Sequence, residues 1–97
     1  MNFVEKIKAK RRLANSILNY LIELEKESKE ECAMKLNRSD WSMSFKSSFN
    51  GQEVAYRIEK EEFFEVCEDA KSSEEVKEKI DALGVQKYYE SIIKLRN

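Results

Sequence analysis

The chain has 97 residues, 41% hydrophobic and 38% charged, with a formal net charge of −1 at pH 7. This length suits one small domain spanning residues 1–97, and the balance of apolar and charged residues is typical of a folded protein, not of a disordered one. The chain has no histidine and only two glycines, so it lacks the usual neutral-pH base and a glycine-rich phosphate loop.

The absence of histidine excludes most of the common types of catalytic site. Without it, a Ser-His-Asp or Cys-His site cannot form within one chain, and two separated cysteines fall short of a structural zinc site. The 19 acidic residues offer many carboxylate pairs, but no spacing singles one out. We therefore expect a protein that is not an enzyme, with no cofactor and no metal site.

The two cysteines, Cys32 and Cys67, lie in apolar-patterned contexts, which favours free buried thiols and a reducing compartment. No secretion leader precedes the first predicted helix, and no apolar run approaches the ~20 residues that span a bilayer. We expect a cytoplasmic protein that does not enter a membrane. The absence of proline, with abundant Lys, Glu, Ser and Ile, is typical of low-GC bacterial, phage or mobile-element genes.

The first predicted element is one long N-terminal helix from Asn2 to about Leu36, where apolar residues recur at helical spacing. Ser28 is the place where it could break. Around its middle, apolar residues such as Ile17 and Leu21 cover about half the circumference, more than the stripe of a surface helix. We expect the middle of this helix to be covered from two sides.

A β-hairpin comes next, with strands at about 41–49 and 52–59. Apolar and polar residues alternate on both sides of Asn50-Gly51, a dipeptide that suits a two-residue type I′ turn. This turn places Phe45 opposite Tyr56 and puts the apolar residues of both strands on one face. No third strand is predicted, so we expect the inner face to pack on the long helix and both edges of the hairpin to be free.

Two to three short helices follow the hairpin and complete an α+β fold. The first contains Phe63 and Cys67 on one face. Ser72 with Glu75 matches a capping box for the next, and Gly84 suits the position just past a helix end. A last helix begins near Val85.

Acidic residues suggest one function. A dense acidic face can dock on a basic partner with steered association, although the same carboxylates could be the wet face of a core helix. We expect a non-enzymatic protein-binding module, of inhibitor or adaptor type, that uses the acidic helix from Glu61 to Asp69 and the hairpin. Its partner-binding residues would be Glu61, Glu62, Glu65, Glu68, Asp69, Ser44, Lys46 and Arg57.

Basic residues near the N-terminus suggest the alternative, a small DNA-binding protein with the hairpin as a wing. Five basic side chains and one glutamate give residues 1–15 a net charge of +4, the footprint of phosphate binding, although a solvated helix end is the plainer reading. The nucleic-acid-binding residues would be Lys6, Lys8, Lys10, Arg11 and Arg12.

The first helix carries basic residues near its N-terminus and glutamates towards its C-terminus, so the charges at both ends oppose its macrodipole. Two copies packed antiparallel would bring the basic end of one against the acidic end of the other. We therefore expect a protein partner, and we consider a homodimer through the first helix or through the hairpin edge.

Overall fold

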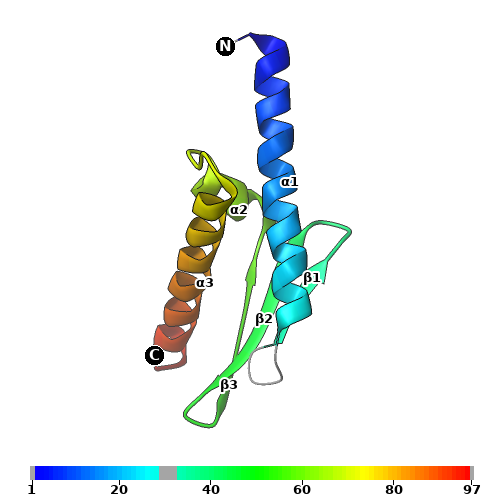
Figure 1. Ribbon diagram of the computed structural model, residues 1–97. Coiled ribbons are helices and arrows are strands. Elements are labelled where there is room, and N and C mark those ends of the chain that lie inside the picture. Colours follow the sequence, from blue (N-terminus) through cyan, green and yellow to red (C-terminus); the bar gives the residue numbers. More distant parts are fainter. Residues whose placement is uncertain (1, 29–32, 97) are drawn as a thin grey trace.

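The computed structural model describes residues 2–28 and 33–96 of the chain (Figure 1). Three strands form one antiparallel sheet, in the order β1-β2-β3. Two long helices, α1 and α3, lie on the same face of this sheet, and the short α2 connects β3 to α3 at one end (Figure 1). The elements are α1 (Phe3–Glu27), β1 (Ala33–Asn37), β2 (Ser42–Phe49), β3 (Gln52–Ile58), α2 (Lys60–Cys67) and α3 (Ser73–Arg96). The predicted α+β class is confirmed.

The strand β1 was not predicted. The N-terminal helix ends at Glu27, not near Leu36, because Ser28 adopts an extended backbone and its hydroxyl donates a hydrogen bond to the Glu25 carbonyl at 3.0 Å. The β1 stretch, Ala-Met-Lys-Leu-Asn, contains good helix formers, but it pairs with β2 in the structure. Tertiary pairing overrides helix propensity here.

The hairpin of β2 and β3 has the predicted register. Phe45 lies opposite Tyr56 and Lys46 opposite Ala55, and both turn residues, Asn50 and Gly51, have positive φ values of 52° and 79°. The predicted strand limits differ from the observed ones by one residue at Trp41 and at Glu59. The expectation that both hairpin edges are free is wrong for β2, since β1 occupies that edge.

The C-terminal part contains one short and one long helix. Glu59 and Glu62 form a capping box at the start of α2, and the Ser72 hydroxyl accepts a hydrogen bond from the Glu75 N–H at 3.2 Å at the start of α3. The prediction of a helix end at Gly84 is wrong, because α3 passes through Gly84 and extends from Ser73 to Arg96, a total of 24 residues. A glycine inside a helix costs only about 1 kcal/mol, which the packing of both halves of α3 can offset.

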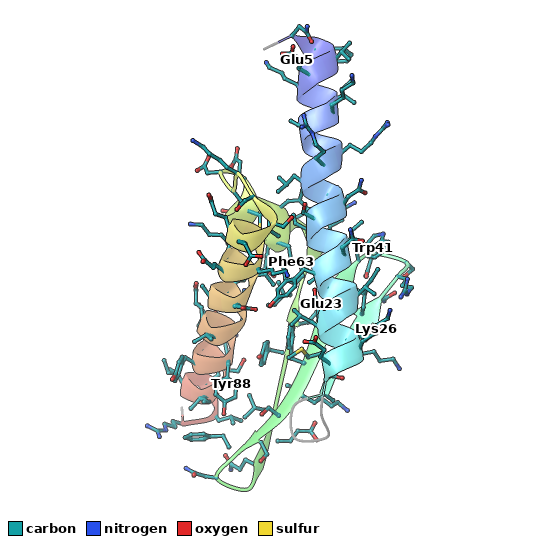
Figure 2. All side chains as sticks on the ribbon, in the orientation of Figure 1. Glu5, Glu23, Lys26, Trp41, Phe63 and Tyr88 are labelled. Carbon is teal, nitrogen blue, oxygen red and sulfur yellow. The ribbon has the colours of Figure 1, made fainter. Side chains whose placement is uncertain are left out.

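The core lies between the sheet and the three helices. Phe63, fully buried, points into this space (Figure 2). Cys67 is a free, buried thiol whose pKa is raised by burial, while Cys32 lies outside the described residues. The other core residues are Ile17, Leu21, Leu36, Met43, Phe45, Ile58, Val76, Ile80 and Leu83. The inner face of the hairpin shares this core with both long helices. The main helix–sheet contacts are those of α3 with β3 and of α1 with β1, so the hairpin does not pack on α1 alone.

The N-terminal third of α1 projects beyond this core (Figure 1). The radius of gyration is 14.8 Å, compared with about 12.5 Å for a compact domain of this length. Figure 2 shows Glu5 at the free end of the helix, clear of the sheet. No helix within residues 2–28 or 33–96 has the length and apolar content needed to cross a membrane.

Candidate functional site

The projecting end of α1 exposes large apolar side chains. From Asn2 to Arg12 every residue except Ala9 is exposed, and the exposed fractions of Phe3, Val4 and Ile7 are 77%, 57% and 42%. One face of α1 carries residues spaced alternately by four and three positions, namely Phe3, Ile7, Lys10, Ala14, Ile17 and Leu21. The apolar stripe that is buried at Ile17 and Leu21 therefore continues past the core into open space.

This stripe forms one side of an open groove of about 920 Å³ between α1 and α2. Its apolar lining comes from both helices and from Ala70, which lies three residues beyond the end of α2. The other apolar residues of the lining are Phe3, Ile7, Ala9, Leu13 and Phe64. Its charged lining comprises Lys6, Lys10, Lys60, Glu61, Glu65 and Glu68. The α1 side of the groove is basic, and the α2 side is mainly acidic.

The groove unites residues that the sequence assigned to two different functions. Lys6 and Lys10 were predicted to bind nucleic acid, while Glu61, Glu65 and Glu68 were predicted to bind a protein. Among the residues that the structure describes, no ion pair within 4.0 Å links the two sides. The opposite charges face one groove without neutralising each other directly.

The remaining basic residues lie elsewhere on α1. At 100° per residue, Lys8 and Arg12 lie about 140° and 180° around the helix from Phe3, and Arg11 lies about 80° from it. All three are exposed. The Arg12 Nε donates a long hydrogen bond of 3.5 Å to the Lys8 carbonyl, and Arg12 borders a second hollow with Ala70. The basic cluster is therefore divided between the groove and other sides of the helix.

Two acidic residues of the predicted set are not part of the groove. Glu62 forms an ion pair with Lys87 of α3 and accepts a hydrogen bond from the Glu59 N–H at 2.9 Å. These two donors hold the pKa of the Glu62 carboxyl below its usual value. Asp69 is exposed just beyond α2 and does not line the groove. Glu62 has a structural role, which its position in the capping box could have indicated from sequence.

The hairpin residues of the predicted set lie on the face of the sheet turned away from the helices. Ser44 and Arg57 are opposite each other there, and Lys46 is exposed beside them. The Arg57 guanidinium donates to Asp40 at 2.6 Å and to Glu59 at 2.7 Å. Arg57 is thus engaged within the chain, and the hairpin and the acidic helix do not form one surface.

The two edges of the sheet differ. The Leu36 N–H points outward from β1 and donates to the Glu25 carboxylate at 2.7 Å, so α1 covers part of that edge. In the hairpin, the pair that flanks the Asn50-Gly51 turn is hydrogen-bonded, and hydrogen-bonded and non-hydrogen-bonded pairs alternate along the strands. Glu53, Ala55 and Arg57 of β3 are in non-hydrogen-bonded pairs, so their backbone N–H and C=O groups point away from β2. The β3 edge borders a hollow of about 350 Å³ beside α3.

Sequence reasoning missed a third surface, on the C-terminal half of α3. Val85, Tyr89 and Ile93 are 55%, 61% and 58% exposed, and their spacing of four residues could have indicated a stripe. Beside them is an open groove of about 420 Å³, where the rings of Phe45 and Tyr56 are stacked at 4.8 Å. The adjacent residues Tyr88 and Tyr89 are half-buried and exposed respectively, as their 100° offset requires.

Within residues 2–28 and 33–96, no group of three or more acidic or cysteine side chains is arranged so that it could hold a metal ion. No protein-family model matches the chain, and neither a curated protein nor a solved structure matches it.

Proposed function

We propose that the chain is a non-enzymatic protein-binding module whose docking site is the groove between α1 and α2. One observation carries the proposal: the apolar stripe of α1 leaves the core and continues, exposed at Phe3 and Ile7, along a groove with a basic and an acidic side. Exposed apolar patches with a polar rim are typical of protein interfaces.

The shape and chemistry of the groove suit an amphipathic helix. A helix in a groove gains affinity from its apolar face, while flanking charges set orientation and suppress wrong partners. Lys6 and Lys10 favour carboxylates on one flank of the incoming helix, and Glu61, Glu65 and Glu68 favour cations on the other. The expected partner segment therefore carries an apolar stripe between an acidic and a basic flank.

A designed helical peptide with such a stripe, labelled with a fluorophore, tests this proposal. We expect its anisotropy to rise in a titration with the protein, and we expect no rise for a peptide whose apolar stripe is replaced by serine. The double variant Phe3→Ser and Ile7→Ser should lose binding, because both side chains line the groove and are exposed.

The matched control removes the other exposed apolar surface through Val85→Ser and Tyr89→Ser, and it should retain the peptide. Equal binding by the protein and by the Phe3 and Ile7 double variant would contradict the proposal, as would no binding by either at concentrations at which the protein is monomeric.

A second candidate function, DNA binding, is favoured by the basic residues of α1 that do not line the groove. Lys8, Arg11 and Arg12 are exposed, and in the described ranges no carboxylate lies within 4.0 Å of them. Such side chains can bind phosphates. An electrophoretic shift at low salt that is lost when all three are replaced by alanine would support it, and the absence of a shift would exclude it.

A further inference from the structure

We infer that the helix occupying the groove is the projecting end of α1 from a second copy of this chain, so that two copies pair about a two-fold axis that runs along the groove and sets the basic side of each groove against the acidic side of the other. This inference rests on the proposed function of the groove and names its partner. Each copy would insert Phe3 and Ile7 into the other copy's groove.

The side chains of the projecting end are left uncovered by their own chain, since from Asn2 to Arg12 only Ala9 is not exposed. Its first ten residues extend about 15 Å at 1.5 Å per residue. Asn2 caps this end by accepting a hydrogen bond from the Glu5 N–H at 2.9 Å, but Lys6 in the first turn opposes the macrodipole, and only Glu5 is acidic there. A helix end of this kind gains from an apolar, acidic surface placed against it.

The chain itself carries such a surface on α2. Its acidic groove residues are Glu61, Glu65 and Glu68, yet within the described residues none of them is close enough to Lys6 or Lys10 for an ion pair. When the two-fold axis runs along the groove, Lys6 and Lys10 of one copy can approach these glutamates of the other while the apolar stripe fills the groove. The same contacts then occur twice, as an isologous two-fold interface requires.

The charge balance favours a copy of this chain over an unrelated helix. The groove offers two lysines on α1, and three glutamates with one lysine on α2 and its C-terminal cap, so its two sides carry opposite and equal net charge. Rotation about a two-fold axis that runs along the groove sets each basic side against an acidic side, so this surface is complementary to itself. Phe3 is 77% exposed in the single chain, and pairing would bury this side chain in both copies, which is favourable.

Charge-reversal variants give the experiment. One variant carries Lys6→Glu and Lys10→Glu, and the other carries Glu61→Lys and Glu65→Lys. By size-exclusion chromatography with light scattering and by analytical ultracentrifugation, the protein should be a dimer. Each variant alone should be a monomer, with its dimer dissociation constant raised at least about tenfold, since like charges then face each other.

Mixing the two variants in equal amounts separates contacts between chains from contacts within a chain. In the mixed dimer each reversed side meets an opposite charge on the other chain, so we expect dimers to return. Charge pairs within one chain would remain repulsive in both variants and could not be rescued by mixing. Far-UV circular dichroism of each variant checks that the altered residues, which are exposed, leave the fold intact.

The control variant carries Lys8→Glu and Arg11→Glu, at exposed positions of α1 that do not line the groove, and it should dimerise like the original chain. A protein that stays monomeric up to millimolar concentration would overturn the inference, and so would a variant mixture that stays monomeric. If the monomer still binds the designed peptide through Phe3 and Ile7, only the second copy is excluded as partner and the proposed function stands. If it binds neither, both fail.

Discussion

Replacing Gly84 by alanine is expected to stabilise the protein. Gly84 lies in the interior of α3, and a Cβ atom added there would meet no heavy atom within 4 Å. No clash opposes the change, so the difference in helix propensity decides its effect. That difference is about 0.8–1.0 kcal/mol in favour of alanine.

For a domain near 100 residues, a gain of 1 kcal/mol raises the melting temperature by roughly 4–8 °C. Thermal unfolding followed by circular dichroism measures this shift, and urea unfolding gives the free energy directly. Ala82→Gly is the matched control, because Ala82 is exposed two residues earlier in the same helix. It should lose about as much stability as Gly84→Ala gains.

An unchanged or lower melting temperature for Gly84→Ala, while Ala82→Gly shows its expected loss, would refute this prediction. That result would mean that the backbone at residue 84 is not an ordinary helical one, or that other atoms fill the space beside it.

Three further predictions concern contacts between elements. Tyr20→Phe removes the 2.5 Å hydrogen bond from the phenol to Asp81 and should cost about 1 kcal/mol. Burial and this bond raise the pKa of Tyr20, so its stabilisation is present below pH ~10 and is lost as the pH rises through the folded-state pKa. Glu62→Gln should retain the cap but remove the charge that pairs with Lys87. Because the pKa of Glu62 is lowered in the fold, the resulting loss of stability should be present above pH ~4.3 and vanish as the pH falls through the folded-state pKa. Gly51→Ala places a side chain at a φ of 79° and should cost about 1–2 kcal/mol.

Chemical unfolding at several pH values measures all three. Wild-type stability that declines in parallel with that of Tyr20→Phe above pH 10 would contradict the first prediction. A Glu62→Gln deficit that persists unchanged in strong acid would contradict the second. A Gly51→Ala protein as stable as the original would mean that the turn is not type I′.

The sequence by itself determined the elements whose cause is local. The Asn50-Gly51 turn and the alternation on either side of it predict the hairpin register correctly, because turn geometry and pleat leave one pairing that keeps the apolar residues together. The start of α3 follows from Ser72 and Glu75 in the same way. In each case a few adjacent residues supply both the geometry and the hydrogen bonds.

Only the tertiary structure decided the rest. Ala33–Asn37 is a strand because β2 offers it an edge, although its residues are good helix formers. Gly84 remains helical because both halves of α3 pack on the body, which outweighs a propensity cost of about 1 kcal/mol.

The groove is the clearest case. Lys6 and Lys10 are more than fifty positions from Glu61 and Glu65, and no periodicity in either segment indicates that they face each other. Their approach depends on how α1 and α2 pack on a common core, which is a property of the whole fold and of no single stretch of the chain.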